Sequence, residues 1–516
     1  MDALSDQAEC GAQTVCMHCG DVMVDTITPQ HVDVLIVGAG LSGIGGACHL
    51  RQSCPDKSFL LLEGRDSFGG TWDVFRFPGI RSDSDLYTYG YNFKPWQGKP
   101  IATAPEILHY LDETIEEYGL AERIRYGHRV QRVGWSSQDA YWTVQATSQG
   151  DTRWFTCHFL WMCSGYYNYE QAYTPAFPGL EHYQGVLVHP QFWPEDLDYR
   201  GKTVIVIGSG ATAVTLIPAM AEQVAHLTML QRSPSYIISR ENQPPLRKLL
   251  EGLDLPDAWV HEILRRRSLK DAELLATMAR HQPEKLREEL IGAIRAQLPD
   301  CDVDTHFTPR YMPWKQRLCL VPDNDLFTAI RGGNISIVTD EIETFTKAGI
   351  RLKSGQELVA DMIVSATGLQ LCPLGNIDFT VDGGGVDIAE TWTYKGIMYS
   401  DIPNMAWTFG YIRTSWTMRS DLIAAFVCRV LHHMDAKGVR QCTPRLRPED
   451  AGMKARRFID EEDFAPGYMA RSMASFPRQG DREPWRNAQD YSMEKETLPG
   501  CELEDGVSVF DNQARE

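Results

Sequence analysis

The sequence predicts an α/β fold with two Rossmann-like units and a helical insertion in the second unit. Two apolar stretches, VDVLIVGAG at 32–40 and KTVIVIGSG at 202–210, each have the pattern of a buried parallel strand that runs into a glycine turn. A helical pattern follows each turn. Residues 245–298 instead carry apolar side chains at helical spacing, with charged residues between them, which indicates amphipathic helices. With 516 residues, the chain has room for about three domains of the usual size.

The other expected elements follow from local patterns along the chain. SFLLLEG at 58–64 has the pattern of a second buried strand, and the alternating side chains of 141–165 indicate antiparallel strands that return to the first unit. The segment from residue 444 onward is polar and is expected to be rich in loops. Strand patterns after the helical segment occur at 334–340, 349–355 and 360–368.

Composition and charge limit the kinds of partner. The chain is 43% hydrophobic and 23% charged, which is ordinary for a soluble globular protein. Its net charge of −19 would repel a nucleic acid, so no nucleic-acid partner is expected. The longest apolar runs are far shorter than the roughly 20 residues of a membrane helix, so no transmembrane span is expected. The N-terminus lacks a secretory signal pattern, which favours a cytoplasmic location, and a peripheral membrane contact stays open.

We predict a division of the chain into a tail, two nucleotide-binding domains and an insertion. The insertion is expected to be a helical cap rather than a helix that lies on a membrane. The predicted limits are 1–30 for the tail, 31–182 and 376–516 for a discontinuous FAD-binding domain, 183–240 and 311–375 for an NADP-binding domain, and 241–310 for the insertion.

Cysteine usage predicts neither disulfides nor a metal site. Thirteen cysteines, an odd number, are scattered without regular spacing, which is typical of reduced thiols. Cys16 and Cys19 form a C-x-x-C pair in the tail, but no second pair follows at zinc-site spacing. We therefore expect no bound metal and interpret the pair as part of an inert tail.

The first glycine turn has the pattern of a dinucleotide site. Gly38, Gly40 and Gly43 form G-x-G-x-x-G between a strand and a helix, and Glu63 ends the next strand twenty residues later. Glycines at these places let a pyrophosphate approach the N-terminus of the helix, and an acidic residue at the end of the second strand accepts hydrogen bonds from a ribose 2′-hydroxyl. A tight turn without a nucleotide is the weaker alternative.

The second turn predicts a phosphorylated ribose. Gly208, Gly210 and Ala213 repeat the pattern as G-x-G-x-x-A, but Arg232 stands where an acidic residue would bind NAD. A guanidinium can bind a 2′-phosphate through two hydrogen bonds, so the site is interpreted as an NADP site, with an ordinary surface arginine as the alternative. Together the two turns predict an enzyme whose FAD is reduced by NADPH. Small residues at the ends of two other strands, CSG at 163–165 and ATG at 366–368, would let the backbone pass close to each dinucleotide.

Longer motifs resemble a known family. The segment YQGVLVHPQFWP at 183–194 matches F-x-G-x-x-x-H-x-x-x-W-P, the identifying motif of Baeyer–Villiger monooxygenases, which are class B flavoprotein monooxygenases. Tyr183 replaces the Phe and keeps an aromatic ring. GGTWDVFRFPGIRSDSD, from Gly69, resembles a second motif of that family. The similarity runs from about residue 31 to 490, and phrases such as CSGYYNY and HPQFWPEDLDY resemble the ethionamide-activating type.

The resemblance and the two turns together imply a set of cofactor contacts. These residues are expected to contact FAD or NADP(H): Gly38, Gly40, Ser42, Gly43, Glu63, Gly70, Thr71, Trp72, Asp83, Tyr89, Val130, Gly208, Ser209, Gly210, Ala211, Thr212, Ala213, Arg232, Ser233 and Gln316. Gln316 departs from the family, in which many members have a lysine immediately before the catalytic arginine. This departure is expected to weaken the preference for NADPH.

The resemblance also implies the reaction and its catalytic residues. Arg317 matches the family's catalytic arginine, and Asp83 is expected to hold it in place; from its local sequence alone, Arg317 would pass for a surface arginine. The implied reaction converts a ketone to an ester or lactone with NADPH and O2 through a C4a-peroxyflavin, and sulfides or thioamides are expected substrates as well. A guanidinium keeps its proton because its pKa exceeds about 12, so it can hydrogen-bond an anionic peroxide without protonating it.

The segment with Gly185, His189, Trp193 and Pro194 is expected to join the two domains. His189 is interpreted as a hinge anchor, because hinge residues lie away from the chemistry that they gate, and direct general-base catalysis is the alternative. A thiol reductase is disfavoured because no close cysteine pair follows the second glycine turn. An S- or N-oxygenating flavin monooxygenase without substantial ketone activity is the main rival, and a nucleotide-sensing module would leave Arg317 and Asp83 unexplained. The oligomeric state is not predicted.

Overall fold

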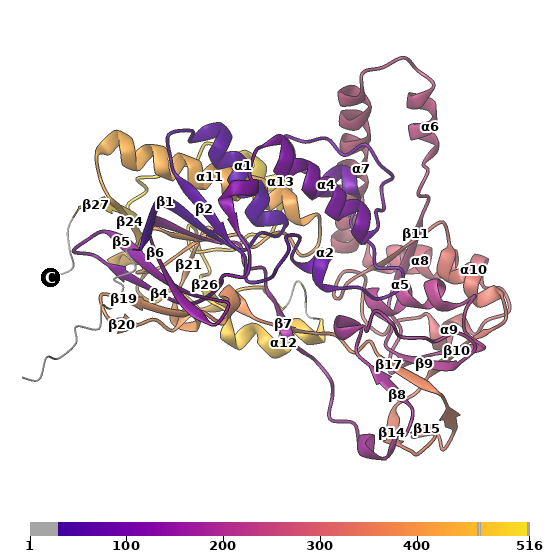
Figure 1. Cartoon of the computed structure of the whole chain (residues 1–516). Coiled ribbons are helices and arrows are strands. Elements are labelled where there is room, and N and C mark those ends of the chain that lie inside the picture. Colours follow the sequence, from indigo (N-terminus) through magenta and orange to yellow (C-terminus); the bar gives the residue numbers. More distant parts are fainter. Residues whose placement is uncertain (1–28, 462–463, 465, 513–516) are drawn as a thin grey trace, which may run out of the picture.

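The computed structural model describes residues 29–461, 464 and 466–512. Cys16 and Cys19 lie outside these residues. A large mixed sheet and a smaller parallel sheet form two units that lie beside each other (Figure 1). The predicted α/β fold is confirmed.

The large sheet is built around a buried parallel strand, β1. Residues 34–36 of this strand are fully buried, and β1 pairs in parallel with β2 and β6 on its two sides. As the alternation at 141–165 predicted, β5 and β6 are antiparallel. The spatial order is β20 (Gly384–Gly385), β19 (Asp378–Val381), β4 (Arg129–Ser136), β5 (Tyr141–Ser148), β6 (Asp151–Met162), β1 (Gln30–Val37), β2 (Phe59–Leu62) and β3 (Ile124–Arg125), with β23 (Met405–Trp407) also paired to β6.

Helices cover one face of this sheet, and short elements complete the unit (Figure 1). The helices of this unit on that face are α1 (Leu41–Ser53), α2 (Thr71–Val74), α3 (Leu86–Tyr89), α4 (Ala104–Glu117), α11 (Trp416–Lys437) and α13 (Tyr491–Thr497). Helix α12 (Gly467–Ser472) lies on the other side of the sheet, where Met469 packs in one core cluster with Leu35 and Leu160. The short strand pairs are β7 (Tyr167–Ala172) with β18 (Leu369–Leu371), β21 (Thr393–Tyr394) with β22 (Met398–Tyr399), β24 (Gln441–Pro444) with β27 (Ser508–Asp511), and β25 (Arg456–Arg457) with β26 (Arg478–Gln479). In the described residues after 444, short helices and strand pairs alternate with longer loops, which confirms the predicted loop-rich C-terminal part.

The smaller sheet is entirely parallel. Its order is β13 (Ile335–Thr339), β10 (His226–Gln231), β9 (Thr203–Ile207), β17 (Met362–Ser365) and β8 (Val186–Val188), with α5 (Ala211–Met220) and α10 (Asp325–Arg331) beside it. A three-stranded antiparallel sheet of β14 (Ile342–Phe345), β15 (Gly349–Leu352) and β16 (Glu357–Val359) and the pair β11 (Ile237–Arg240) and β12 (Cys319–Pro322) complete this unit. The chain therefore leaves the large sheet after β6 and returns to it at β19, and the separate pair β7–β18 lies on the two crossing segments.

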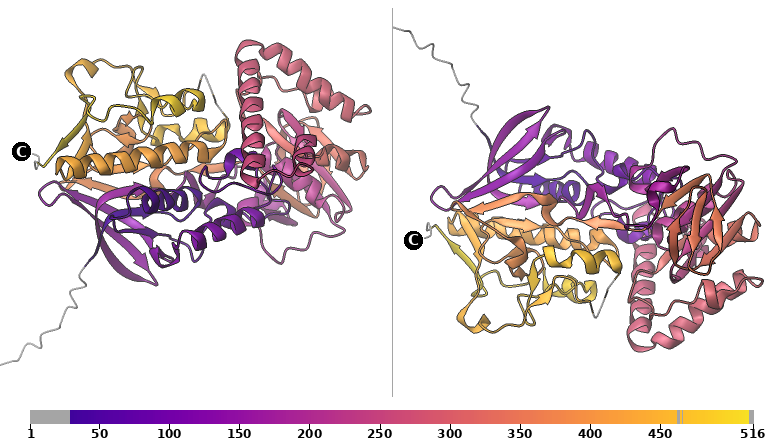
Figure 2. Two further views of the ribbon diagram at one scale, coloured as in Figure 1. Left: turned by 90° about the horizontal axis from the view of Figure 1, so that it is seen from above. Right: turned by 90° about the horizontal axis from the view of Figure 1, so that it is seen from below.

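The predicted helical segment forms α6 (Pro245–Glu251), α7 (Asp257–His281) and α8 (Pro283–Gln297), followed by α9 (Val303–His306). Helix α7 stands at the boundary of the two units (Figure 2). Arg265 Nη1 donates to Tyr87 O at 2.7 Å, and Ser268 Oγ donates to Asp85 Oδ2 at 2.7 Å. Helix α7 therefore contacts α3 and the residue that precedes it. Among the described residues, no helix is both long and apolar enough to cross a membrane.

Candidate functional site

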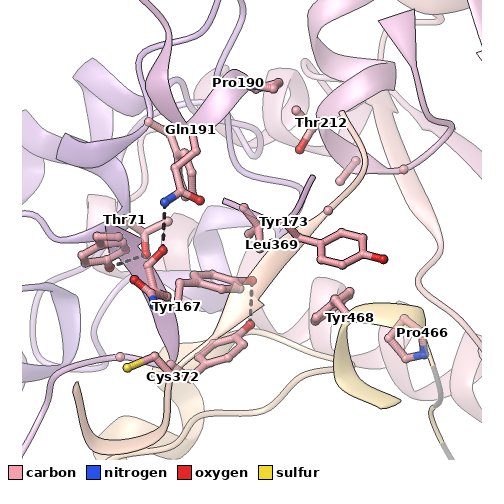
Figure 3. Close-up of a pocket in the computed structure, with 18 of the residues that line it drawn as sticks. Thr71, Tyr167, Tyr173, Pro190, Gln191, Thr212, Leu369, Cys372, Pro466 and Tyr468 are labelled. Atoms are coloured by element: carbon pink, nitrogen blue, oxygen red, sulfur yellow. Dashed lines mark hydrogen bonds between the residues drawn. The ribbon is translucent and has the colours of Figure 1, made fainter. Parts of the chain in front are cut away.

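A cavity of about 1080 Å³ lies between the two units and is lined by both glycine turns. Figure 3 shows Thr71, Tyr167, Gln191 and Tyr468 among its lining residues. The expected site residues that line it are Gly38, Gly40, Ser42, Glu63, Gly70, Thr71, Trp72, Asp83, Tyr89, Val130, His189, Gly208, Ser209, Gly210, Ala211, Thr212, Arg232, Ser233, Gln316 and Arg317. The expected residues outside the lining are Gly43, Ala213, Gly185, Trp193 and Pro194.

The first glycine turn needs its glycines for close backbone contacts. Gly38 has φ +106°, and a Cβ there would lie 2.6 Å from Cys163 O. A Cβ on Gly43 would lie 1.9 Å from Gly38 O, so this third glycine lets α1 begin directly against the turn and acts from behind the cavity lining. The N-terminus of α1 therefore faces the cavity with free N–H groups, which favour an anion.

Glu63 holds the same turn by two backbone hydrogen bonds. Its Oε2 accepts from Ala39 N at 2.7 Å and its Oε1 accepts from Arg65 N at 3.0 Å. Burial raises the pKa of this carboxyl group, although both backbone hydrogen bonds oppose the shift. Each oxygen keeps a further lone pair with which it can accept a bond from a ribose hydroxyl.

The second turn repeats this construction at the smaller sheet. Gly208 has φ +137°, and a Cβ there would lie 2.4 Å from Ala366 O. The segments CSG and ATG thus pass the first glycine of each turn, as expected from their small residues. Ser209 Oγ donates to Ser233 O at 2.9 Å, and Ala213 is fully buried at the position that Gly43 has in the first turn.

Arg232 follows the end of β10 at the edge of the cavity. Its side chain is exposed and makes no hydrogen bond or ion pair with any residue that the structure describes. The charge of Arg232 acts on the acidic Glu341, but the pKa of Glu341 is lowered first by its hydrogen bond with Lys353 and only more weakly by Arg232. The guanidinium of Arg232 is therefore available to a phosphate group.

Arg317 and Asp83 meet in the cavity from opposite units. Arg317 precedes β12, whereas Asp83 lies between α2 and α3, and the two residues are 234 positions apart. Arg317 Nε and Nη2 each donate to one oxygen of Asp83, both at 2.6 Å. This is the contact that the resemblance implies. About 32% of the Arg317 side chain stays exposed to the cavity, so the ion pair leaves part of the guanidinium free.

The surroundings keep Arg317 charged. Burial alone would lower the pKa of the guanidinium, but the charge of Asp83 and the hydrogen bonds with it hold that pKa well above its ordinary value. Burial raises the pKa of the neighbouring Tyr167 and Tyr468 phenols, so both are neutral near pH 7. The Arg317–Asp83 ion pair is therefore flanked by neutral phenol hydroxyl groups.

A set of aromatic side chains forms a wall that the sequence did not indicate. Tyr166 stacks on Trp416 with ring centres 5.1 Å apart, and Trp416 Nε1 donates to Ser42 Oγ at 2.8 Å. Thr71 Oγ1 hydrogen-bonds Tyr169 Oη at 2.9 Å (Figure 3). The phrase CSGYYNY contains two of these rings, but nothing in it predicts that they face a cavity. Tyr468 and Trp416 come from helices for which no local signal was found.

The expected linker motif connects the crossing segments. Gln191 N donates to His189 Nδ1 at 3.1 Å, so His189 carries its hydrogen on Nε2, which lies 3.2 Å from the acceptor Gly368 O. Burial lowers the pKa of His189, so the neutral form is favoured. Gln191 Nε2 also donates to Asn168 O at 2.8 Å (Figure 3). The motif therefore contacts both segments that connect the two units. His189 contacts the segment between β17 and β18, and Gln191 contacts β7.

The other motif residues have structural contacts. A Cβ on Gly185 would lie 2.6 Å from Asp361 O, and the hydroxyl that distinguishes Tyr183 from Phe donates to Ala360 O at 2.9 Å. Trp193 packs edge-on against Tyr199 and belongs to the core of the smaller sheet. Tyr183 therefore retains the packing of Phe and adds one hydrogen bond to the strand edge.

The cavity fits two dinucleotides. A Cβ at the first glycine of each turn would clash with the backbone, so both turns leave room for a close ligand. The N-termini of α1 and α5 point into the cavity, where they favour an anionic group, and the unpaired Arg232 can bind a phosphate. Two lining atoms, Ser164 Oγ and Gln191 Oε1, are buried without a hydrogen-bond partner in the described part of the chain. Buried polar atoms of this kind need a partner, which a bound ligand can supply. Within the described ranges, no group of three or more His, Cys, Asp or Glu side chains could hold a metal ion.

Fold and cavity together define the class of enzymes that bind two dinucleotides side by side. Two family models match the chain: Flavin-binding monooxygenase-like over residues 101–247 and NAD(P)-binding Rossmann-like domain over residues 36–96. The chain is 48% identical over 465 residues to the FAD-containing monooxygenase EthA of Mycobacterium tuberculosis, covering 90% of this chain and 94% of that protein. It is 42% identical over 492 residues to the probable FAD-binding monooxygenase AlmA of Acinetobacter baylyi, covering 94% and 97%.

Solved structures agree with these relatives. A steroid monooxygenase bound to NADP matches with a TM-score of 0.68 and 26% identity, covering 81% of this chain and 88% of that chain. Cyclohexanone monooxygenase from Rhodococcus sp. Phi1 bound to NADP+ has the same fold, with a TM-score of 0.66, 22% identity and coverage of 82% and 87%. The chain belongs to the class B flavin monooxygenases of the Baeyer–Villiger and EthA type. This confirms the predicted family and the predicted enzyme class, an FAD-containing monooxygenase.

Proposed function

We propose that this enzyme uses NADPH and O2 to convert ketones to esters or lactones, and that it also oxidises sulfides or thioamides. The observation that carries the proposal is the Arg317–Asp83 pair, which lies in one cavity with both glycine turns. FAD and NADP are the cofactors, and the bound flavin supplies the activation of oxygen. An S- or N-oxygenating enzyme without substantial ketone activity is the alternative.

The residues of the chain support the proposal by charge and by shape. Arg317 lines the same cavity as the first glycine turn, the proposed FAD site, and carries a permanent positive charge. This charge can stabilise negative charge on oxygen, and the guanidinium does not give up its proton. The phenols of Tyr167 and Tyr468 stay neutral beside it because burial raises their pKa, so they add no negative charge there. Asp83 is a positioning residue, because its two hydrogen bonds fix the plane of the guanidinium.

A product assay tests the proposal. The purified holoenzyme is incubated in air with NADPH and a panel of linear, cyclic and aryl ketones, thioethers and thioamides, and the oxygenated product is compared with the hydrogen peroxide released. Esters or lactones formed in proportion to the NADPH consumed support ketone oxygenation. Sulfoxides without any ester would favour the alternative, and NADPH consumption without any oxygenated product would contradict both.

We propose the domain limits stated above for the FAD-binding and NADP-binding domains, with Glu63 at the FAD ribose and Arg232 at the NADP 2′-phosphate. The two parallel strand sets and their glycine turns support this division. Gln316 lines the cavity beside Arg317, where it can offer a neutral hydrogen bond instead of the charge of a lysine.

Replacement of Arg232 by alanine is expected to raise the KM for NADPH roughly tenfold, because a charge-assisted contact to the 2′-phosphate is lost. The KM for NADH, which lacks that phosphate, should stay unchanged. Steady-state kinetics with both nucleotides measure this difference. Arg200, an exposed arginine paired with Asp198, provides the matched control. An equal rise for NADPH and NADH would contradict the assignment.

Replacement of His189 by glutamine is expected to slow flavin reduction and oxygenation together while the substrate KM stays constant. The physical reason is that His189 ties Gly368 to the linker and is not aimed at the reacting atoms. Stopped-flow absorbance separates the two half-reactions. His226, a surface histidine that hydrogen-bonds Ser336, serves as the control position. A loss confined to oxygenation would favour direct catalysis by His189.

We infer a cytoplasmic location in which the insertion acts as a cap and its tip makes a peripheral contact with lipid. Leu249, Leu253 and Trp259 are 62%, 50% and 66% exposed at the turn between α6 and α7. Cosedimentation with phosphatidylcholine vesicles should therefore fall for Trp259→Ser, whereas Trp154→Ser, at an exposed tryptophan of the large sheet, should bind as the unchanged enzyme does. No binding by the unchanged enzyme would refute the contact.

A further inference from the structure

Helices α1 and α11 run side by side from the cofactor cavity to a pair of cysteines. At the cavity end, Trp416 Nε1 donates to Ser42 Oγ, and at the far end Cys54 Sγ lies 4.0 Å from Cys428 O. Both contacts join residues 374 positions apart, so the two helices are parallel and in register. The two thiols also lie close enough to shift each other's pKa, which is lowered at Cys54 and raised at Cys428.

A histidine stands next to this pair. His432 lies one helical turn after Cys428 on α11, and its Nε2 is 3.4 Å from Cys54 Sγ. The other charged groups that face Cys54 are Lys57 and Asp435, which form an ion pair at 2.6 Å. The hydrogen bond with Cys428 and the charges of His432 and Lys57 lower the pKa of Cys54, whereas burial and Asp435 oppose that shift.

Cys54 opens into a cavity of its own. The side chain is only 3% exposed, but it lines a cavity of about 280 Å³ that lies apart from the cofactor cavity. The lining residues are Arg51, Cys54, Pro55, Lys57, Phe59 and Arg123. Three of them are cationic and none is acidic, so this cavity favours a thiolate and admits a small polar oxidant.

The other cysteines lack this combination. Cys54 has a pKa below its ordinary value, whereas the pKa values are raised at Cys48, Cys157, Cys163, Cys301, Cys319, Cys372, Cys428 and Cys442. Cys48, on the same helix, is fully buried, and burial raises its pKa. Cys301 and Cys501 are more exposed than Cys54, so accessibility alone would predict oxidation at those two residues first.

We propose that Cys54 is a site of oxidation by hydrogen peroxide and that Cys428 then resolves it to an intrachain disulfide. His432 takes the proton of the Cys54 thiol, and the thiolate attacks one peroxide oxygen. The S–O bond forms, the O–O bond breaks, and hydroxide leaves as water with the proton returned by His432. The Cys428 sulfur then attacks the sulfenic sulfur, and hydroxide leaves as water with the Cys428 proton. Two thiols thus give two electrons to one peroxide.

Mass spectrometry of the full-length holoenzyme tests this proposal. The enzyme is treated with a small excess of hydrogen peroxide, its remaining thiols are alkylated, and it is digested without reductant. The expected result is a disulfide-linked pair of peptides that contain Cys54 and Cys428, with a mass lower by two hydrogen atoms than the sum of the two separate peptides. Dithiothreitol should abolish this species. Oxidation of Cys301 or Cys501 with Cys54 and Cys428 still alkylated would overturn the proposal.

Three variants separate the roles. Cys428→Ser should leave a sulfenic acid at Cys54 that dimedone traps, whereas Cys54→Ser should abolish both the cross-link and the trapped adduct. Cys48→Ser, at a buried cysteine of the same helix, should retain the cross-link. Because the unchanged enzyme is mapped directly, a variant that fails to fold does not decide the result. Cross-linking at an unchanged rate in His432→Gln would contradict the part assigned to the histidine.

Discussion

Replacement of Arg317 by alanine is expected to lower the rate of substrate oxygenation by a factor of about 10² to 10³, while NADPH still reduces the flavin. The variant removes a guanidinium that faces the cavity and is fixed by two hydrogen bonds to Asp83. It also leaves the carboxylate of Asp83 without its partner, and that unpaired negative charge would disfavour a second anion nearby. Oxygen that is activated but not used should then appear as hydrogen peroxide.

The two half-reactions can be measured separately. Stopped-flow absorbance under anaerobic conditions follows flavin reduction, and product analysis in air compares oxygenated product with hydrogen peroxide. Asp83→Asn is expected to have a smaller effect, because the amide still offers one acceptor oxygen to Arg317. Arg331, an exposed arginine on α10 that hydrogen-bonds Gln297, is the control position. If Arg317→Ala oxygenated substrate at the original rate, the catalytic role assigned to Arg317 would be wrong.

The nucleotide turns could be predicted because their determinants are local. A buried strand, a glycine at positive φ and a helix N-terminus lie within a dozen residues of sequence, and Glu63 and Arg232 end the next strand. The backbone atom that contacts each glycine turn could not be predicted from the sequence. Gly38 is required by Cys163 O and Gly208 by Ala366 O, and these contacts join distant strands of each sheet. The sequence shows that small residues end these strands, at 163–165 and 366–368, but not which glycine each strand end contacts.

The catalytic pair could not be found from local sequence. Arg317 and Asp83 are separated by 234 positions, and each lies in a polar segment that resembles a surface loop. Only the family motifs pointed to them. Similarly, α11 gave no amphipathic signal, because buried residues surround it and include polar ones such as Arg419 and Asp421. Residues 416–424 of α11 are all buried or half-buried, so the first half of this helix has no solvent-exposed face whose polar residues could give an amphipathic pattern.

Replacement of Arg419 by methionine is expected to lower the free energy of unfolding by about 3–5 kcal/mol, because it leaves a buried carboxylate without its partner. Arg419 and Glu494 are 0% and 4% exposed, and they join α11 to α13 through two hydrogen bonds at 2.9 and 3.2 Å. The guanidinium also donates to the Phe409 and Lys395 carbonyl groups. Burial alone would lower the pKa of Arg419, but Glu494 more than offsets that effect, so the guanidinium keeps its charge in the folded protein.

A set of variants separates the lost partner from the lost side chain. Urea denaturation followed by fluorescence compares Arg419→Met with the double variant Arg419→Met/Glu494→Leu. The double variant should regain much of the loss, since a buried ion pair replaced by apolar groups of similar volume is often neutral in stability. The exposed pair Arg266–Glu262 on α7 is the matched control, and its loss should cost only about 0.3–0.5 kcal/mol. If Arg419→Met were as stable as the unchanged enzyme, Glu494 would have to be neutral in the fold, and the connection from α11 to α13 would then depend on packing alone.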